Sequence, residues 1–334
     1  MQVTSLQGNG PRPPQAIPFN APVDLLGAYA LPAIGRVFMV RGDGTNVTQY
    51  DDQYSLQSPD QTRRLYPSVA SALALCVASR GDTILVLPNH TENLGAATTS
   101  SWTFKAGVRI VGLGQGSAIP TFTMTTATSK LNLNAVNVSI SGCRFLCAGP
   151  AGTTALTVAA PFTMSAVGCS LIGNEFEVGI DNDQLCTTFL TVSAARCTFS
   201  YNSAESQSVA STPTAGIVIT AADKFLCEGN RCKAAFATAA TGWITHATTA
   251  SVDIVIRKNF FWQWLAISSG GINLAANLAT TGTIEDNYFK TNLTTNVLPI
   301  VTSGTGVVVS LFNNYVVNDT NQTGVLVGTV SDAS

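Results

Sequence analysis

Closely spaced carboxylates are the first residues in this chain whose type and spacing could support catalysis. Glu175 and Glu177 lie two residues apart, so on a strand both side chains would face the same side. Such a pair could bind a cation or act as acid and base, because glycoside hydrolysis needs two carboxylates about 5–9.5 Å apart. No Asp or Glu lies between Glu92 and Glu175, so a long stretch of chain carries no acid. We therefore favour a solvated turn at Glu175 and Glu177 over a catalytic pair.

The other ionisable residues are scattered. His246 has no Ser, Cys or acid motif beside it, which favours a packed or loop histidine. Asp253 and Arg257 are four residues apart and would form a surface ion pair on a continuous strand. The eight cysteines include no C-x-x-C pair, and the chain has two histidines, so zinc is not expected. We expect buried free thiols rather than disulfides, no catalytic residue, no cofactor and no metal.

The densest aromatic run in the chain contains Phe260, Phe261, Trp262 and Trp264. On a strand these side chains alternate between two faces, so some of the rings must point outward. Exposed rings of this size mark a binding surface. A contact between subunits is our first interpretation and sugar stacking the second, while packing of the rings into a core through a bulge remains open.

The composition limits the class of protein. The 334 residues are 46% hydrophobic and 11% charged, with a formal net charge of −2, so global disorder is excluded. There is no basic excess for a nucleic-acid partner, and no apolar run of about 18 residues for a membrane partner. The N-terminus lacks the pattern of an export signal. Low charge on an apolar chain suits a permanent assembly that covers much of the surface.

The chain divides into three segments. Residues 1–34 form a Pro-rich extended arm, because proline fixes φ and removes backbone donors. The arm is either a loose terminus or a tether on a neighbouring subunit, in which case its contact residues are Pro11, Pro13, Pro14, Pro18 and Phe19. Residues 35–92 contain a first strand at 35–40, a loop, and an amphipathic capping helix from Ser68 to Ser79 that Gly81 ends. Residues 93–334 are expected to form a parallel β-helix.

A recurring triplet supports the β-helix. A Cys or Asn is followed two residues later by a bulky or apolar residue, just after a short apolar strand. The triplets begin at Cys143, Asn174, Cys197, Asn230, Asn259, Asn287 and Asn314, with steps of 31, 23, 33, 29, 28 and 27 residues. A period of this size in a region of strands indicates a solenoid with stacked ladders of Asn, Cys and aromatic side chains inside it. A β-sandwich is the alternative fold, but it would favour strands every 8–12 residues.

Residues 65–73, 80–93 and 105–114 (LYPSVASAL, RGDTILVLPNHTEN and KAGVRIVGLG) resemble the N-terminal region of pectate-lyase-like β-helix proteins. The Pro-x-His-Thr-Glu variant of the turn resembles β-helix virion proteins of tailed bacteriophages, although Asn89 replaces the usual Gly. The resemblance covers roughly residues 65–122. It implies an all-β, right-handed parallel β-helix with a short N-terminal capping helix.

The resemblance and the composition together lead to one functional expectation. The chain is expected to be a non-enzymatic structural virion protein, namely a capsid decoration (cement) protein. It would be made in the host cytoplasm, form a homotrimer and bind major capsid proteins on the capsid surface, with neither nucleic acid nor membrane as partner. The alternative is a phage tailspike that binds or cleaves host polysaccharide. A surface adhesin or secreted lyase ranks third.

Overall fold

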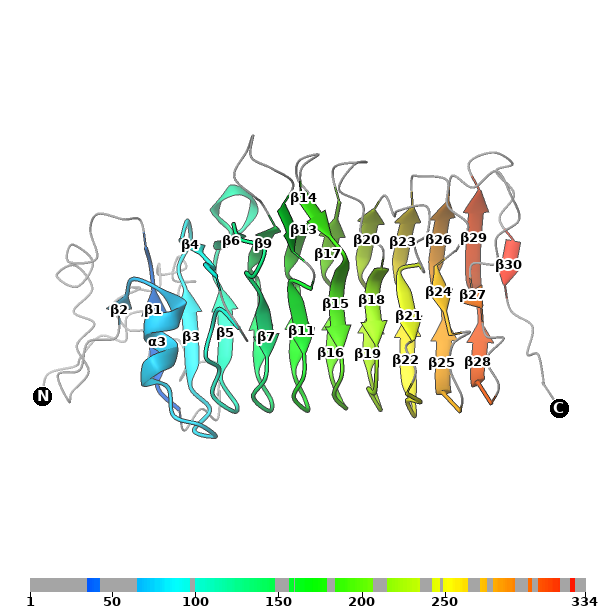
Figure 1. Cartoon of the computed structure of the whole chain (residues 1–334), viewed down its shortest axis with the longest axis horizontal. Coiled ribbons are helices and arrows are strands. Elements are labelled where there is room, and N and C mark those ends of the chain that lie inside the picture. The colour runs from blue at the N-terminus through cyan, green and yellow to red at the C-terminus, as the bar shows by residue number, and fades with distance from the viewer. Residues whose placement is uncertain are drawn as a thin grey trace, which may run out of the picture.

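The chain winds into a parallel β-helix of about seven turns with one α-helix near its N-terminus (Figure 1). The computed structural model describes residues 35–42, 65–96, 100–147, 156–158, 160–178, 184–206, 215–234, 242–246, 249–263, 271–274, 279–291, 300–301, 306–318 and 325–327. The prediction of an all-β parallel β-helix with a short N-terminal helix is confirmed. The predicted arm, with Pro11, Pro13, Pro14, Pro18 and Phe19, lies outside the described residues, and so does Trp264.

Three sheets form the walls of the tube. Sheet A contains, in spatial order, β2 (Leu65–Tyr66), β1 (Val37–Val40), β3 (Thr83–Val86), β5 (Arg109–Gly112), β8 (Ser139–Ser141), β12 (Ser170–Ile172), β16 (Thr198–Ser200), β19 (Leu226–Glu228), β22 (Ile254–Arg257), β25 (Thr281–Glu285) and β28 (Val308–Phe312). Sheet B contains β4 (Thr91–Asn93), β6 (Thr121–Met124), β9 (Arg144–Cys147), β13 (Glu175–Val178), β17 (Ser203–Glu205), β20 (Arg231–Ala234), β23 (Phe260–Gln263), β26 (Tyr288–Thr291), β29 (Asn314–Asn318) and β30 (Val325–Val327).

Sheet C contains β7 (Leu131–Leu133), β11 (Phe162–Met164), β15 (Thr188–Val192), β18 (Ala215–Ile219), β21 (Ile244–His246), β24 (Ile272–Asn273) and β27 (Ile300–Val301). The strands β10 (Leu156–Val158) and β14 (Gln184–Cys186) form a separate pair, and η1 (Gly116–Ala118) is a 3₁₀ turn. The described strand pairs are parallel except β29 with β30. Alternating burial follows from this geometry. In β22, for example, Ile254 and Ile256 face the interior while Val255 and Arg257 face outward.

A ladder of buried asparagines runs along the corner between sheets A and B. After Cys143 it continues through Asn174, Asn202, Asn230, Asn259, Asn287 and Asn314, with steps of 31, 28, 28, 29, 28 and 27 residues. The prediction that placed Cys197 in this series is wrong. Cys197 precedes β16 in sheet A and is aligned with Cys169, which precedes β12. Asn202 escaped the sequence pattern because the small Ala204 follows it where other coils have a larger side chain.

The residue before each ladder position adopts a left-handed backbone conformation. These residues are Gly142, Gly173, Tyr201, Gly229, Lys258, Asp286 and Asn313, with φ between 47° and 67°. The left-handed residue turns the chain sharply from sheet A into sheet B, which is why Gly, Asn and Asp are frequent at this position. The same turn in every coil keeps the ladder asparagines in register.

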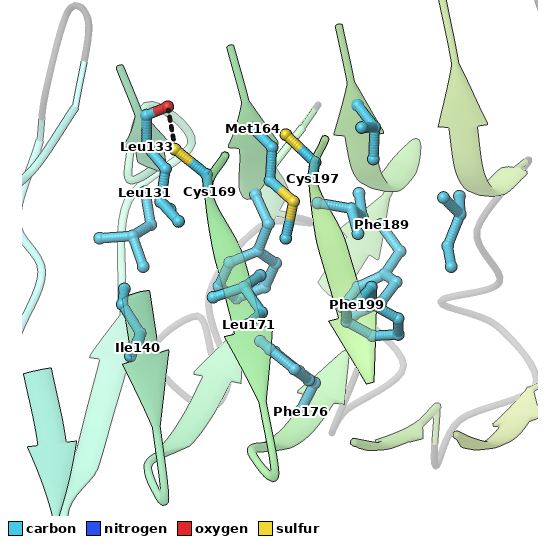
Figure 2. Close-up of a cluster of buried hydrophobic side chains, with 14 of the residues drawn as sticks. Leu131, Leu133, Ile140, Met164, Cys169, Leu171, Phe176, Phe189, Cys197 and Phe199 are labelled. Carbon is cyan, nitrogen blue, oxygen red and sulfur yellow. Dashed lines mark hydrogen bonds between the residues drawn. The ribbon is translucent and has the colours of Figure 1, made fainter. Parts of the chain in front are cut away.

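The interior of the tube contains stacked phenylalanines, as predicted. Phe145 stacks between Phe122 and Phe176, with centroid distances of 5.4 Å on both sides. The next two coils have Ala204 and Cys232 in this column. In the coil of Ala204, Phe189 and Phe199 fill the core by packing against Phe176 of the preceding coil (Figure 2). Each fully buried phenylalanine contributes about 1.5–3 kcal/mol to the free energy of unfolding.

The capping helix is shorter than predicted. α3 spans Val69–Leu75, and Ser68 forms a capping box with Ser71 at its start. The prediction that the helix runs to Ser79 and ends at Gly81 is wrong. Cys76 is already extended, and the N–H of Val77 donates to the Asp82 side chain instead of a helix carbonyl. The buried side of α3 packs against the first coil and covers the open end of the tube.

Candidate binding face

Two columns of side chains point outward from sheet B, and together we call them the sheet B face. The strands that carry them are β9, β13, β17, β20, β23, β26 and β29. The first column is Arg144, Glu175, Ser203, Arg231, Phe260, Tyr288 and Tyr315. The second column is Leu146, Glu177, Glu205, Lys233, Trp262, Lys290 and Val317. The face is therefore charged in its N-terminal half and aromatic and cationic in its C-terminal half.

The charged half contains the carboxylates that the sequence singled out. Glu175 and Glu177 lie on strand β13, so the predicted solvated turn is wrong, although their common orientation is as expected. Arg144 contacts Glu175 at 2.6 Å and Glu177 at 3.9 Å from the neighbouring coil. Further along the face, Lys233 contacts Glu205 at 2.6 Å. One guanidinium thus serves both members of the candidate acid pair, as in a surface ion cluster.

The aromatic half is built by β23 and β26. Phe261 and Gln263 are buried, while Phe260 and Trp262 are half-buried on the outer side, so the predicted alternation of large side chains on both faces is confirmed. Phe260 and Tyr288 stack almost in parallel, with centroids 5.3 Å apart and an interplanar angle of 8°. The outward column then ends at Tyr315, which is exposed.

Trp262 is held between two lysines of the adjacent coils. The Nζ atoms of Lys233 and Lys290 lie 5.1 and 4.5 Å from the centroid of its ring. Since one lysine comes from each side along the tube, both faces of the indole are engaged in cation–π contacts. The stack of Phe260 on Tyr288 likewise covers one face of each ring. The groups that this half presents on its outer side are thus mainly ring edges, because the Lys233 ammonium is already paired with Glu205 and lies over Trp262.

The expected pair between Asp253 and Arg257 is not formed. Arg257 contacts Glu228 at 3.0 Å and Glu285 at 3.8 Å, which are its partners in the preceding and following coils. Neighbouring strands are only about 4.8 Å apart, whereas four residues along a strand span about 13 Å. The charged side chains nearest to Arg257 therefore lie on the adjacent coils, and not further along its own strand.

The histidine and cysteine side chains are buried in the fold. His246 is buried, and its Nε2 lies 2.9 Å from the Ser251 hydroxyl, which accepts a hydrogen bond from the N–H of Ala222. The prediction of a packed histidine is confirmed.

The eight cysteines are free and buried, also as predicted. Burial raises the pKa of the Cys143 thiol to about 12, so it stays protonated. The described residues contain no group of three His, Cys, Asp or Glu that could hold a metal.

Two acids, the buried Asp82 and the partly buried Glu92, stabilise the N-terminal cap, and sequence reasoning did not assign them a role. Asp82 accepts hydrogen bonds from the backbone N–H groups of Arg36 and Val77, and from the Arg80 side chain at 2.6 and 2.7 Å. It thereby ties the start of β1 and the end of α3 to one carboxylate. The Arg-Gly-Asp-Thr-Ile segment that carries the resemblance was the available signal.

Glu92 has the corresponding role at the start of α3. It accepts a hydrogen bond from the N–H of Val69 at 2.8 Å and one from the Trp102 indole at 3.3 Å. His90 lies beside it, with Nε2 3.2 Å from the Glu92 carboxylate and Nδ1 accepting from the N–H of Gly42. The proton of neutral His90 is thus assigned to Nε2. The His-Thr-Glu turn is a structural clamp on the cap.

Comparisons with protein-family models, curated proteins and solved structures find no match to this chain. In the part of the chain that the structure describes, no helix combines the length and apolar character needed to cross a membrane.

Proposed function

We propose that this chain is a non-enzymatic structural protein of a tailed-phage particle, which acts as a capsid decoration protein through contacts of its sheet B face. The observation that carries the proposal is the group of aromatic and lysine side chains that point outward from β23 and β26. The expected partners are further copies of the chain, in a homotrimer, and the major capsid protein. The expected location is the capsid surface.

The geometry of the rings favours a protein partner over a sugar. A sugar ring stacks on the open face of an aromatic ring, but both faces of Trp262 lie against lysines and Phe260 is stacked on Tyr288. Ring edges carry partial positive charge. They are complementary to the carbonyl and carboxylate oxygens of a protein surface, and they are surrounded by apolar ring area that such a contact can bury.

The ionisable groups support a contact role rather than catalysis. The acids of the sheet B face are paired with basic residues, and the two histidines, His90 and His246, are buried and hydrogen-bonded within the fold. A rigid tube with flat walls is also suited to wide contacts. A stable interface buries about 800 Å² on each partner, which several neighbouring coils of one sheet can supply.

The alternative is a tailspike that binds or cleaves host polysaccharide, and the half-exposed Phe260 and Trp262 are the observation that favours it. Counting the chain in purified particles by quantitative mass spectrometry separates the two. A decoration protein is expected on the order of hundreds of copies per particle, set by the capsid symmetry, and a tailspike at a few tens at most. Absence of the chain from the purified particles would overturn both.

The role of the face is tested by substitution. Trp262→Ala combined with Tyr288→Ala should weaken binding of the purified chain to stripped capsids by at least about tenfold, because aromatic anchors dominate interfaces. Thr163→Ala on the outer side of sheet C is the matched control and should bind normally. Equal binding by both variants would refute a contact through sheet B. Release of reducing ends from host polysaccharide by the purified chain would refute the non-enzymatic role.

A further inference from the structure

Strand β28, the last strand of sheet A, lies at the C-terminal end of the tube (Figure 1). Among the described strands it pairs with β25 alone, whereas β29, the neighbouring strand of sheet B, is covered by β30. The N–H of Val308 and the carbonyl of Phe312 both bond to residues that flank β25. Because bonding alternates along a parallel strand, the backbone groups of Val309 and Leu311 point away from β25, and we call them the β28 edge.

The side chains of β28 are also partly open to solvent. Val309 and Leu311 point into the tube but are only half-buried, whereas Ile284, which is in register with Leu311 one coil earlier, is fully buried. On the outer side, Val308 is 70% exposed and Phe312 is 50% exposed. Apolar side chains are thus accessible on both faces of a strand whose backbone edge has no partner among the described strands.

The sequence of β28 lacks the usual protection of an edge strand. Native edges are protected against pairing by a charge, a proline or a bulge. β28 reads Val-Val-Ser-Leu-Phe, and no charged residue occurs between Lys290 and Asp319. The other end of sheet A differs, because its last strand, β2, has two residues and α3 covers that end of the tube. The β28 edge therefore has no matching strand at the N-terminal end of another copy, and its counterpart is the same edge of that copy.

We propose that two copies of the chain join end to end by antiparallel pairing of their β28 edges about a two-fold axis at Ser310. In this register Ser310 lies opposite the partner's Ser310. Val309 lies opposite the partner's Leu311, and Val308 lies opposite the partner's Phe312. The pair of Val309 with the partner's Leu311 exchanges both N–H···O bonds, and the axis repeats this pair. The contact uses the backbone groups that point away from β25, so it breaks no bond within the tube.

The strand is complementary to itself in this register, as a two-fold contact requires. On the outer face the β-branched Val308 meets an aromatic ring, which is a favourable cross-strand pair, and the small Ser310 leaves room at the axis. On the inner face the half-buried Val309 and Leu311 meet across the contact. The absence of charge on β28 removes like-charge repulsion between the copies. The inference does not depend on the proposed function, whose contact is made through the sheet B face.

A reporter cysteine at the axis tests the register in the full-length chain. The native thiols are buried, so Ser310→Cys introduces an exposed one. Opposite residues at a site of this kind have Cα atoms about 4.5 Å apart, which a disulfide can bridge. Under mild oxidation Ser310→Cys should form a cross-linked dimer at least about tenfold faster than Ile172→Cys, an exposed control on the outer side of sheet A. Equal rates would overturn the proposal.

Charges at the same position give an independent readout by sedimentation equilibrium. Ser310 is exposed, so Ser310→Lys and Ser310→Glu should keep the fold, which circular dichroism checks. Each variant alone places like charges opposite each other and should weaken self-association at least about tenfold, whereas an equal mixture of the two should restore it. Native-like association of either variant alone, or a mixture that stays weak, would overturn the proposal. Trp262→Ala with Tyr288→Ala should leave the Ser310→Cys cross-link unchanged, which separates this contact from the one proposed for the sheet B face.

Discussion

The asparagine ladder offers the most direct test of how this tube is stabilised, and Asn230 lies near its centre. The Nδ2 group of Asn230 donates to the carbonyl of Phe199 at 2.8 Å and to Oδ1 of Asn259 at 2.9 Å. Its Oδ1 accepts from the backbone N–H of Asn202 at 2.9 Å and from the Asn202 side chain at 3.1 Å. The residue is fully buried, so water replaces none of these bonds.

Asn230→Ala should lower the free energy of unfolding by about 2–6 kcal/mol. The change deprives the Asn202 N–H and the Phe199 carbonyl of a buried partner, and each orphaned group costs about 1–3 kcal/mol. Asn230→Asp is the sharper variant, because it keeps the shape and the acceptor oxygen but removes the donor. Its ionised carboxylate would face the Asn259 Oδ1 and the Phe199 carbonyl, so we expect a loss at least as large at pH 7.

The assay is urea unfolding followed by circular dichroism, together with hydrogen exchange of peptides from β16 to β20. Exchange is needed because a solenoid can open coil by coil, which breaks two-state behaviour. Ser203→Ala, on the exposed side of β17, is the control and should change stability by no more than about 0.5 kcal/mol. If Asn230→Ala behaves like this control, the ladder does not stabilise the corner and our explanation of the repeat is wrong.

Three further predictions concern the interior and the cap. Because burial raises the pKa of the thiols, iodoacetamide at pH 8 should modify none of the eight until the chain unfolds, and rapid modification of the native protein would contradict this. Burial tends to raise the pKa of Asp82, but hydrogen bonds from Arg80 and two backbone N–H groups outweigh it and lower the pKa below the ordinary 3.8. Its stabilisation is therefore present above about pH 4 and lost as the pH falls through the lowered pKa, so a pH series of urea unfolding should show a steeper acid loss in the native chain than in Asp82→Asn. Gly173→Ala should cost about 1–2 kcal/mol through left-handed strain alone, whereas Gly142→Ala should cost more, because its Cβ would meet the Gly112 carbonyl oxygen at 2.6 Å; thermal midpoints that rank the two the other way would refute this.

The sequence was sufficient to predict the β-helix because the residues that recur along the sequence occupy the same structural position in successive coils. Asn230, Asn259, Asn287 and Asn314 recur at steps of 29, 28 and 27, and each supplies the same buried hydrogen bonds. The triplet pattern failed in the coil where a small residue occupies the aromatic column. Ala204 replaces a bulky residue in the aromatic column, so the triplet around Asn202 was not recognisable and Cys197 was taken in its place.

The contacts of charged residues were harder to predict for a geometric reason. Local spacing indicated a pair between Asp253 and Arg257, but the partners of Arg257 are 29 residues before it and 28 residues after it. Ion pairs between coils can be predicted only after the register of every coil is known. The same holds for the cap, where Glu92 reaches back across the loop to the first turn of α3.

The distribution of apolar surface along the tube bears on how the protein would assemble. Charges in the N-terminal half of the sheet B face are compensated within the chain, as in the pairs of Arg144 with Glu175 and Lys233 with Glu205, so a partner there would have to displace existing ion pairs. In the C-terminal half the rings of β23 and β26 contact one another and two lysines, while Tyr315 on β29 remains 48% exposed. These strands lie toward the opposite end of the tube from β1 and α3 (Figure 1). Under the proposed function, a lateral contact through these rings would leave the end of the tube that carries α3 outside the interface.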